Sequence, residues 1–202
     1  MTKFDQRYQG DTFFYGTEPN TFLAAQASRI PAGGAVLSLG EGEGRNAVFL
    51  AQQGLRVQAL DESAVGLDKA VRWAAARGVA ITTRCVHLAQ YTLAANRWDA
   101  IVSIWCHLDS PLRRRLHAEV VHALRPGGVF ILEAYTPAQI GRGTGGPSDA
   151  DLLPSAAQLN AELAGLEVLQ SVELERDVHE GQGHRGRSAV VQWIGRRPAA
   201  GI

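Results

Sequence analysis

The sequence predicts an α/β fold, a Rossmann-like doubly wound sheet whose strands are mostly parallel. Short apolar runs of strand length alternate with longer stretches in which apolar residues recur at helical spacing. This alternation is typical of parallel strands joined by right-handed helical crossovers. The chain then continues into two extended segments, 166–178 and 187–194, which predict an antiparallel β-hairpin with its loop at 179–184.

The local pattern predicts each earlier element. Asn20 is expected to cap a short helix that ends before Pro31, because its side chain can accept a hydrogen bond from the first helical turn. The expected strands are 35–39, 57–60, 79–85, 100–104 and 129–134, and the further helices are 46–53, 63–77, 111–124 and 156–164. A sharp turn is expected at 125–128, and the glycine-rich segment 137–155 is long enough to be a mobile loop over a site.

Composition limits the class of protein and of partner. A chain of 202 residues with 46% hydrophobic content fits one domain spanning 1–202, in which the aromatic segment 1–30 precedes the first strand. The formal net charge is zero, so neither a nucleic-acid partner nor a membrane partner is expected. Cys85 and Cys106 lie in apolar segments and are expected to be reduced core thiols. Without a continuous apolar stretch near the start, a cytoplasmic location is expected.

A glycine-rich loop, 40–44, follows the first strand of the predicted sheet and precedes a helix. This placement predicts a ligand loop, because glycine allows a tight turn and the helix start offers free N–H groups. The dinucleotide pattern G-x-G-x-x-G/A needs a small residue at 45, where the chain has Arg45. The remaining G-x-G-x-G pattern is the spacing found in the S-adenosylmethionine (SAM) loop of class I methyltransferases.

A carboxylate ends the second predicted strand, 17 residues after Gly44. Asp61 is placed to accept hydrogen bonds from a ribose diol, and the adjacent Glu62 is a candidate to share that role. The alternative for Asp61 is that it caps the helix that follows.

Several short motifs together resemble the tellurite-resistance type of SAM methyltransferase. Arg7-Tyr8 and Tyr15-Gly16-Thr17-Glu18-Pro19-Asn20 are similar to the N-terminus of that family, and Gly42-Glu43-Gly44-Arg45-Asn46 to its loop. Leu124-Arg125-Pro126-Gly127-Gly128 is similar to the turn before the fifth strand of many class I methyltransferases. The resemblance extends over residues 4 to about 136.

The resemblance implies a seven-stranded sheet with an antiparallel C-terminal strand and SAM as the cofactor. It implies that SAM lies across the ends of the first two strands and that segment 1–30 covers it, with Tyr8 and Tyr15 as lid residues. The expected cofactor-binding residues are Tyr15, Gly40, Glu41, Gly42, Asn46, Asp61, Glu62, Ser63, His87, Leu88, Ile104 and Trp105. Two positions depart from the family pattern. Ser38 stands where an acid is common. His87 stands where an Asp often binds the adenine amino group.

The predicted reaction is methyl transfer to a small-molecule acceptor, such as a thiol or a chalcogen oxyanion. A soft nucleophile of this kind needs little more than proximity and orientation, so no acid–base pair is expected. His107 is a candidate base for a hydroxyl or amine acceptor; the alternative is a loop histidine with a structural hydrogen bond. Glu133 and Tyr135 are further candidates to face the acceptor. No metal site is expected, because His179 and His184 lack a third clear ligand.

Two other functions stay open at this point. A SAM-binding protein without catalytic activity would share the fold, and the departures at Ser38 and His87 motivate that alternative. A nucleotide-dependent oxidoreductase is disfavoured by Arg45 in the glycine loop. The sequence leaves the identity of the acceptor and the oligomeric state undetermined.

Overall fold

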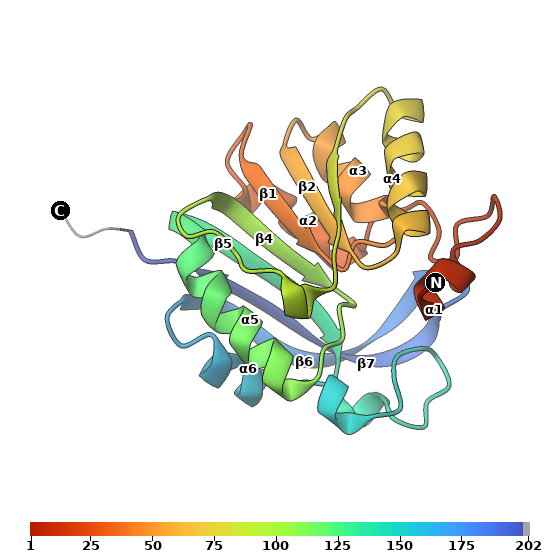
Figure 1. Ribbon diagram of the computed structural model, residues 1–202. Coiled ribbons are helices and arrows are strands. Elements are labelled where there is room, and N and C mark those ends of the chain that lie inside the picture. Colours follow the sequence, from red (N-terminus) through yellow and green to blue (C-terminus); the bar gives the residue numbers. More distant parts are fainter. Residues whose placement is uncertain (200–202) are drawn as a thin grey trace.

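The computed structural model describes residues 1–199, which form one seven-stranded sheet with helices on both faces (Figure 1). The strands are β1 (Ala35–Leu39), β2 (Arg56–Asp61), β3 (Thr82–Cys85), β4 (Trp98–Ile104), β5 (Leu124–Tyr135), β6 (Glu167–Glu180) and β7 (His184–Arg196). Their order across the sheet is β3-β2-β1-β4-β5-β7-β6. The first five strands are parallel, and β7 is antiparallel to both of its neighbours. The predicted fold class is confirmed.

Helices cover the two faces of the sheet in separate layers (Figure 1). The helices are α1 (Lys3–Arg7), α2 (Thr21–Gln26), α3 (Arg45–Gln52), α4 (Ala64–Ala76), α5 (Ser110–Ala123) and α6 (Ala156–Glu162). Four short 3₁₀ helices are η1 (Ala27–Arg29), η2 (Leu88–Gln90), η3 (Pro137–Gln139) and η4 (Ala150–Leu152). One apolar core joins α2, α3 and α4 to the sheet, and a second joins α5 and α6 to the opposite face.

The apolar runs of the central strands are explained by this arrangement. Successive side chains of a strand point to opposite faces, so Val36 packs in the core under α3 while Leu37 packs in the core under α5. Both side chains are fully buried. A strand covered on both faces requires apolar residues throughout, which is why β1 lies at the predicted residues 35–39.

Helix caps follow the sequence in the first half of the chain. The side chain of Asn20 accepts a hydrogen bond from the backbone N–H of Leu23, which confirms the predicted cap of α2. Ser63, and not Asp61, caps α4, because its hydroxyl accepts from the N–H of Gly66 at 3.0 Å. The alternative role of Asp61 as a helix cap is therefore wrong.

Three expectations about the second half need correction. The hairpin loop is limited to 181–183, because β6 and β7 extend further than predicted and include Glu180 and His184. The expected turn at 125–128 belongs to β5, which begins at Leu124 beside Trp98 with an irregular register. Segment 137–155 contains the two short helices η3 and η4, so it is partly ordered by local hydrogen bonds.

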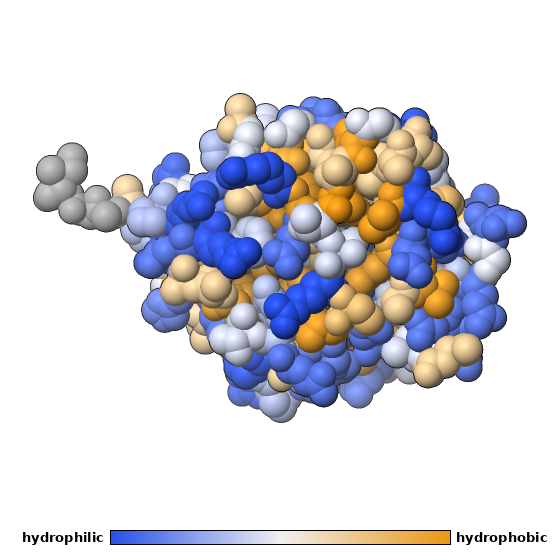
Figure 2. All heavy atoms as spheres, turned by 45° about the horizontal axis from the view of Figure 1, so that its top comes forward, coloured by the Kyte–Doolittle hydropathy of each residue, from blue (hydrophilic) through white to orange (hydrophobic). Residues whose placement is uncertain are grey.

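The cysteine expectation is correct for one residue only. Cys85 is exposed, because β3 is an edge strand with all four residues exposed, whereas Cys106 is partly buried. No helix within residues 1–199 is both long and apolar enough to cross a bilayer. With the top of Figure 1 turned forward, apolar areas of the surface are broken up by hydrophilic side chains (Figure 2).

Candidate active site

A cavity of about 450 Å³ lies at the carboxyl ends of the parallel strands. The strand order reverses direction between β1 and β4, and ligands of doubly wound folds bind at this point. The N-terminal segment, the glycine loop, the ends of β2 and β4, the segment 145–152 and the tip of the β6–β7 hairpin all contribute lining residues. The volume is within the range of about 300–1,000 Å³ that is common for small-molecule sites.

The glycine loop has the backbone that the sequence predicts. Gly42 has a positive φ of 64°, and a Cβ placed on it would lie 2.7 Å from the hydroxyl oxygen of Tyr8. A side chain is therefore excluded here both by the backbone conformation and by the N-terminal segment that lies over the loop.

A buried carboxylate lies beside Ser38, where the family pattern has an acid. Glu41 accepts hydrogen bonds from the backbone N–H groups of Asn46 and Ala47 at 3.0 and 2.8 Å, and from the hydroxyl of Ser38. Its burial raises the pKa of the Glu41 carboxyl. Glu41 thereby caps α3, whose first residue follows the side-chain-free Gly44, and supplies an acidic group close to the position that lacks one.

Asp61 connects the glycine loop to the start of α4. One carboxylate oxygen accepts from the N–H of Gly42 and the other from the N–H of Ser63, both at 2.8 Å. Burial raises the pKa of this carboxyl, and Asp61 is 8% exposed at the cavity wall. Each oxygen still has a lone pair free for a ligand hydroxyl.

His87 lies at the exposed rim of the cavity. Its Nδ1 accepts a hydrogen bond from the N–H of Ala89 at 3.2 Å, so in the neutral ring the hydrogen is on Nε2. That Nε2 lies 3.7 Å from a carboxylate oxygen of Glu62. The ring therefore offers a donor, whereas the predicted contact with an adenine amino group needs an acceptor.

Five aromatic rings form a continuous aromatic wall at the other end of the cavity. The members of this wall are Tyr15, Trp105, His107 and His184, which line the cavity, and Tyr135, which is fully buried and stacks on Trp105. Ring centroids are 4.7 Å apart for Tyr15 and His184, 4.4 Å for Trp105 and Tyr135, and 5.6 Å for His107 and Tyr135. The wall joins the N-terminal segment to the ends of β4 and β5 and to the start of β7.

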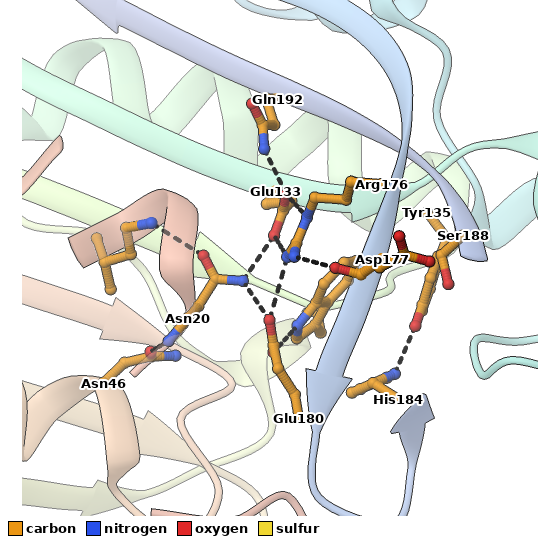
Figure 3. A network of polar contacts seen from close by, with 12 residues as sticks. Asn20, Asn46, Glu133, Tyr135, Arg176, Asp177, Glu180, His184, Ser188 and Gln192 are labelled. Atoms are coloured by element: carbon orange, nitrogen blue, oxygen red, sulfur yellow. Dashed lines mark hydrogen bonds and ion pairs between the residues drawn. The ribbon is translucent and has the colours of Figure 1, made fainter. Parts of the chain in front are cut away.

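A buried polar network supports the aromatic wall from behind (Figure 3). Glu180 accepts hydrogen bonds from Trp105 Nε1 at 2.5 Å and from the guanidinium of Arg45. Arg176 bridges Glu180 and Glu133 at 3.1 and 2.6 Å. Although burial alone would raise it, the charge of Arg45 leaves the pKa of Glu180 lowered, so this carboxylate is ionised. The network fixes Trp105, a non-glycine residue with a positive φ of 56°.

Comparison with known proteins gives the domain class. Residues 36–128 match the family model of a methyltransferase domain. This match confirms the class of domain that the glycine loop predicts. Over 105 residues the chain is 32% identical to the tRNA 5-carboxymethoxyuridine methyltransferase of Escherichia coli. The aligned region covers 50% of this chain and 40% of that protein. The chain thus spans less than half the length of the curated relative.

Solved structures share the whole architecture. One is a structure that concerns the conversion of a disulfide bond into a thioacetal group during echinomycin biosynthesis. It has a TM-score of 0.78 at 21% identity, and the match covers 98% of this chain and 93% of the other. TehB from Haemophilus influenzae has a TM-score of 0.73 at 18% identity, over 96% and 65% of the two chains. The N-methyltransferase NodS from Bradyrhizobium japonicum, in complex with S-adenosylhomocysteine (SAH), has a TM-score of 0.69 at 16% identity, over 96% of both chains. At these identities the likeness establishes the fold.

The methyltransferase-type domain brings most of the predicted site residues together. Those that line the cavity are Tyr15, Gly40, Glu41, Asn46, Asp61, Glu62, His87, Leu88, Ile104, Trp105 and the candidate base His107. Gly42 and Ser63 do not line it; both hold Asp61 through their backbone N–H groups.

The sequence pattern predicts no structural role for Glu43 and Arg45, the charged residues on either side of Gly44. Glu43 accepts from the N–H of Phe14 at 2.8 Å and pairs with the buried Lys69 at 2.5 Å, so it fastens the N-terminal segment to the loop. Arg45 pairs with Glu180. The sequence does hold one indication of these contacts, the acid Glu43 between two glycines of the predicted loop. A charge buried in such a loop needs a partner elsewhere in the chain.

Two wall histidines make the stability of the fold sensitive to acid. Burial lowers the pKa of His107 to about 4 and that of His184 to about 3, from 6.5. The unfolded chain therefore binds more protons below pH 6.5, and each histidine costs up to about 1.4 kcal/mol of stability per pH unit as the pH falls toward these values. Denaturant unfolding between pH 7 and 4 should show this loss.

A pair of variants assigns part of that loss to one ring. His107→Phe should reduce the slope of unfolding free energy against pH, because one titrating group is removed. The same change at His122, a histidine of α5 that is exposed, is the matched control. Equal slopes in the wild type and His107→Phe would show that His107 is not a buried neutral histidine.

Proposed function

We propose that this protein is a SAM-dependent methyltransferase that acts on a small molecule with a soft nucleophile, a thiol or a chalcogen oxyanion, as in the tellurite-resistance type. The observation that carries the proposal is one cavity that joins a methyltransferase-type glycine loop to an enclosed aromatic wall. The likeness to TehB and to NodS with bound SAH supports the cofactor and the subtype.

The residues present fit SAM. When bound, SAM would supply a methyl group on a sulfonium. The ribose hydroxyls would be held by Asp61, with Glu62 beside it, and the methionine part would lie against Gly40, Glu41 and Asn46. The side chains of Leu88 and Ile104 would pack on the apolar parts of SAM. Tyr15 and Trp105 would exclude water from the reacting atoms.

The same proposal extends to the parts of the chain. Residues 1–202 act as one SAM-binding domain, segment 1–30 covers the cofactor, and segment 137–155 moves to admit the acceptor. The formal net charge of zero supports a small acceptor over a nucleic acid or a membrane. The curated relative acts on a tRNA, so a tRNA acceptor is included in the test. A cytoplasmic location stays a prediction.

Calorimetry and a turnover assay test the proposal together. SAM and SAH should each bind at micromolar to sub-millimolar concentration, and SAH should form when thiols or chalcogen oxyanions are added. Absence of binding of both would contradict the proposal. Tight binding of SAM without turnover would favour the non-catalytic alternative. Turnover with tRNA as the only methylated acceptor would show that the acceptor is a nucleic acid and not a small molecule.

The cofactor role of Asp61 gives a quantitative expectation. Asp61→Ala should weaken SAM binding by about 1–3 kcal/mol, since ribose hydroxyls and the N–H of Gly42 lose an acceptor. Asp68→Ala, an exposed carboxylate on α4, is the matched control and should leave the dissociation constant unchanged. Equal constants for wild type and Asp61→Ala would remove Asp61 from the cofactor site.

A further inference from the structure

Nearly every polar atom of the aromatic wall is already used within the protein. The hydroxyl of Tyr15 accepts from Arg7 at 2.6 Å, and Trp105 Nε1 donates to Glu180. The hydroxyl of Tyr135 and Nδ1 of His184 form a hydrogen bond of 2.8 Å. These atoms are occupied in the folded chain, so they are not the groups with which a methyl acceptor would exchange a proton.

One buried nitrogen of the wall, His107 Nε2, has no partner in the described part of the chain. Within residues 1–199, three buried side-chain polar atoms lack a hydrogen-bond partner, and of these only His107 Nε2 belongs to a residue that lines the cavity. Buried polar atoms are almost always hydrogen-bonded, so a lone one beside a cavity calls for a ligand partner.

The other nitrogen of the ring decides what that partner can be. His107 Nδ1 lies 3.3 Å from the backbone carbonyl oxygen of Leu152. A carbonyl oxygen only accepts, so Nδ1 carries the hydrogen. In the neutral ring, Nε2 then has a free lone pair and needs a donor. Burial, which lowers the pKa of His107 to about 4, keeps the ring in this neutral form near pH 7.

We propose that the methyl acceptor is a neutral thiol on a flat apolar group, whose S–H donates to Nε2 of His107. The inference rests on the proposed function and narrows its acceptor class. As the new sulfur–methyl bond forms, the bond from the methyl carbon to the sulfonium breaks. The proton of the thiol passes to His107 Nε2 and from there to water, so His107 is a catalytic base.

The wall favours a thiol over the other acceptor class, a chalcogen oxyanion. Sulfur makes favourable contacts with aromatic rings, whereas the negative faces of these rings disfavour an anion. The oxygens of an oxyanion are hydrogen-bond acceptors, so they would repel the lone pair of His107 Nε2. A flat apolar group can pack on Trp105, which lines the cavity together with His107.

The test compares two thiols that differ in ionisation. Benzyl mercaptan is mostly protonated at pH 7, 4-nitrothiophenol is mostly ionised there, and selenite represents the oxyanions. His107→Phe keeps an aromatic ring against Tyr135 but has no nitrogen. His122→Phe makes the same change at an exposed position of α5. SAM binding by calorimetry is measured in every variant.

A base at His107 predicts a loss that depends on the acceptor. In His107→Phe, kcat/KM for benzyl mercaptan should fall by roughly 10²–10⁴-fold, the range for general base catalysis, and that for 4-nitrothiophenol by less than about tenfold. SAM binding should be unchanged, and His122→Phe should match the wild type throughout.

Three results would overturn the inference: equal losses for both thiols, no loss for either, or a wild type that methylates selenite or tRNA but neither thiol. In the third case SAM binding and turnover persist, so the methyltransferase proposal survives. If SAM does not bind and no acceptor is methylated, the proposed function itself fails.

Discussion

Replacing Glu180 by alanine is expected to lower the free energy of unfolding by about 3–5 kcal/mol, the usual cost of removing one partner from a buried ion pair. The carboxylate is 5% exposed and accepts from four side chains: Arg45, Trp105 at 2.5 Å, Asn20 at 2.9 Å and Arg176 at 3.1 Å. Loss of these acceptors leaves buried donors and an uncompensated guanidinium. Urea unfolding measures the change.

The same strand provides a matched control for this prediction. Glu175, also on β6, pairs with Arg142 at 2.6 Å and with Arg187 at 3.4 Å, but its side chain is 46% exposed. Exposed ion pairs contribute about 0.2–1 kcal/mol, so Glu175→Ala should have a small effect. Similar losses for the two variants would show that burial of the network does not determine its strength.

A second readout separates the structural role of Glu180 from a general loss of stability. Glu180 fixes the indole of Trp105 in the aromatic wall, so its removal should raise KM for the acceptor more than it weakens SAM binding. Assays well below the melting temperature of the variant allow this comparison. An unchanged KM would indicate that Trp105 keeps its position without Glu180.

The sequence was sufficient for the parts of the fold that depend on local patterns. The strand 35–39 lies where its apolar run predicts, because both faces of a central strand must be buried. The cap by Asn20 and the positive φ of the loop glycines likewise depend on a few neighbouring residues. The cluster of predicted cofactor residues around one cavity follows from these elements.

Residues whose partners lie far away along the chain were beyond local reasoning. Glu180 and His184 read as loop residues because glycines surround them, yet both are buried in strands. Arg45, the partner of Glu180, is 135 positions away. The ion pair between Arg45 and Glu180 forms only when the hairpin packs against the glycine loop. A periodic pattern in the sequence reports neighbours within one helix or strand, so it cannot indicate this contact.

The tightest position in the glycine loop gives the second large expected effect. Gly44 has a φ of 95° at the start of α3, and a Cβ on it would lie 2.5 Å from the Cβ and 2.7 Å from the Cα of Ala70 on α4. A left-handed backbone costs alanine about 1–2 kcal/mol, and overpacking adds about 1–3 kcal/mol. Gly44→Ala should therefore lose about 2–5 kcal/mol of unfolding free energy and weaken SAM binding, because α3 and α4 must separate.

Gly54 isolates the packing part of this effect. It has a similar φ of 79°, but nothing lies within 4 Å of a Cβ placed there. Gly54→Ala should therefore lose only the backbone contribution of about 1–2 kcal/mol and keep the SAM dissociation constant of the wild type. If both variants lose the same stability, the contact between the glycine loop and Ala70 does not constrain the fold. If Gly44→Ala binds SAM as the wild type does, the spacing of α3 and α4 does not shape the cofactor loop.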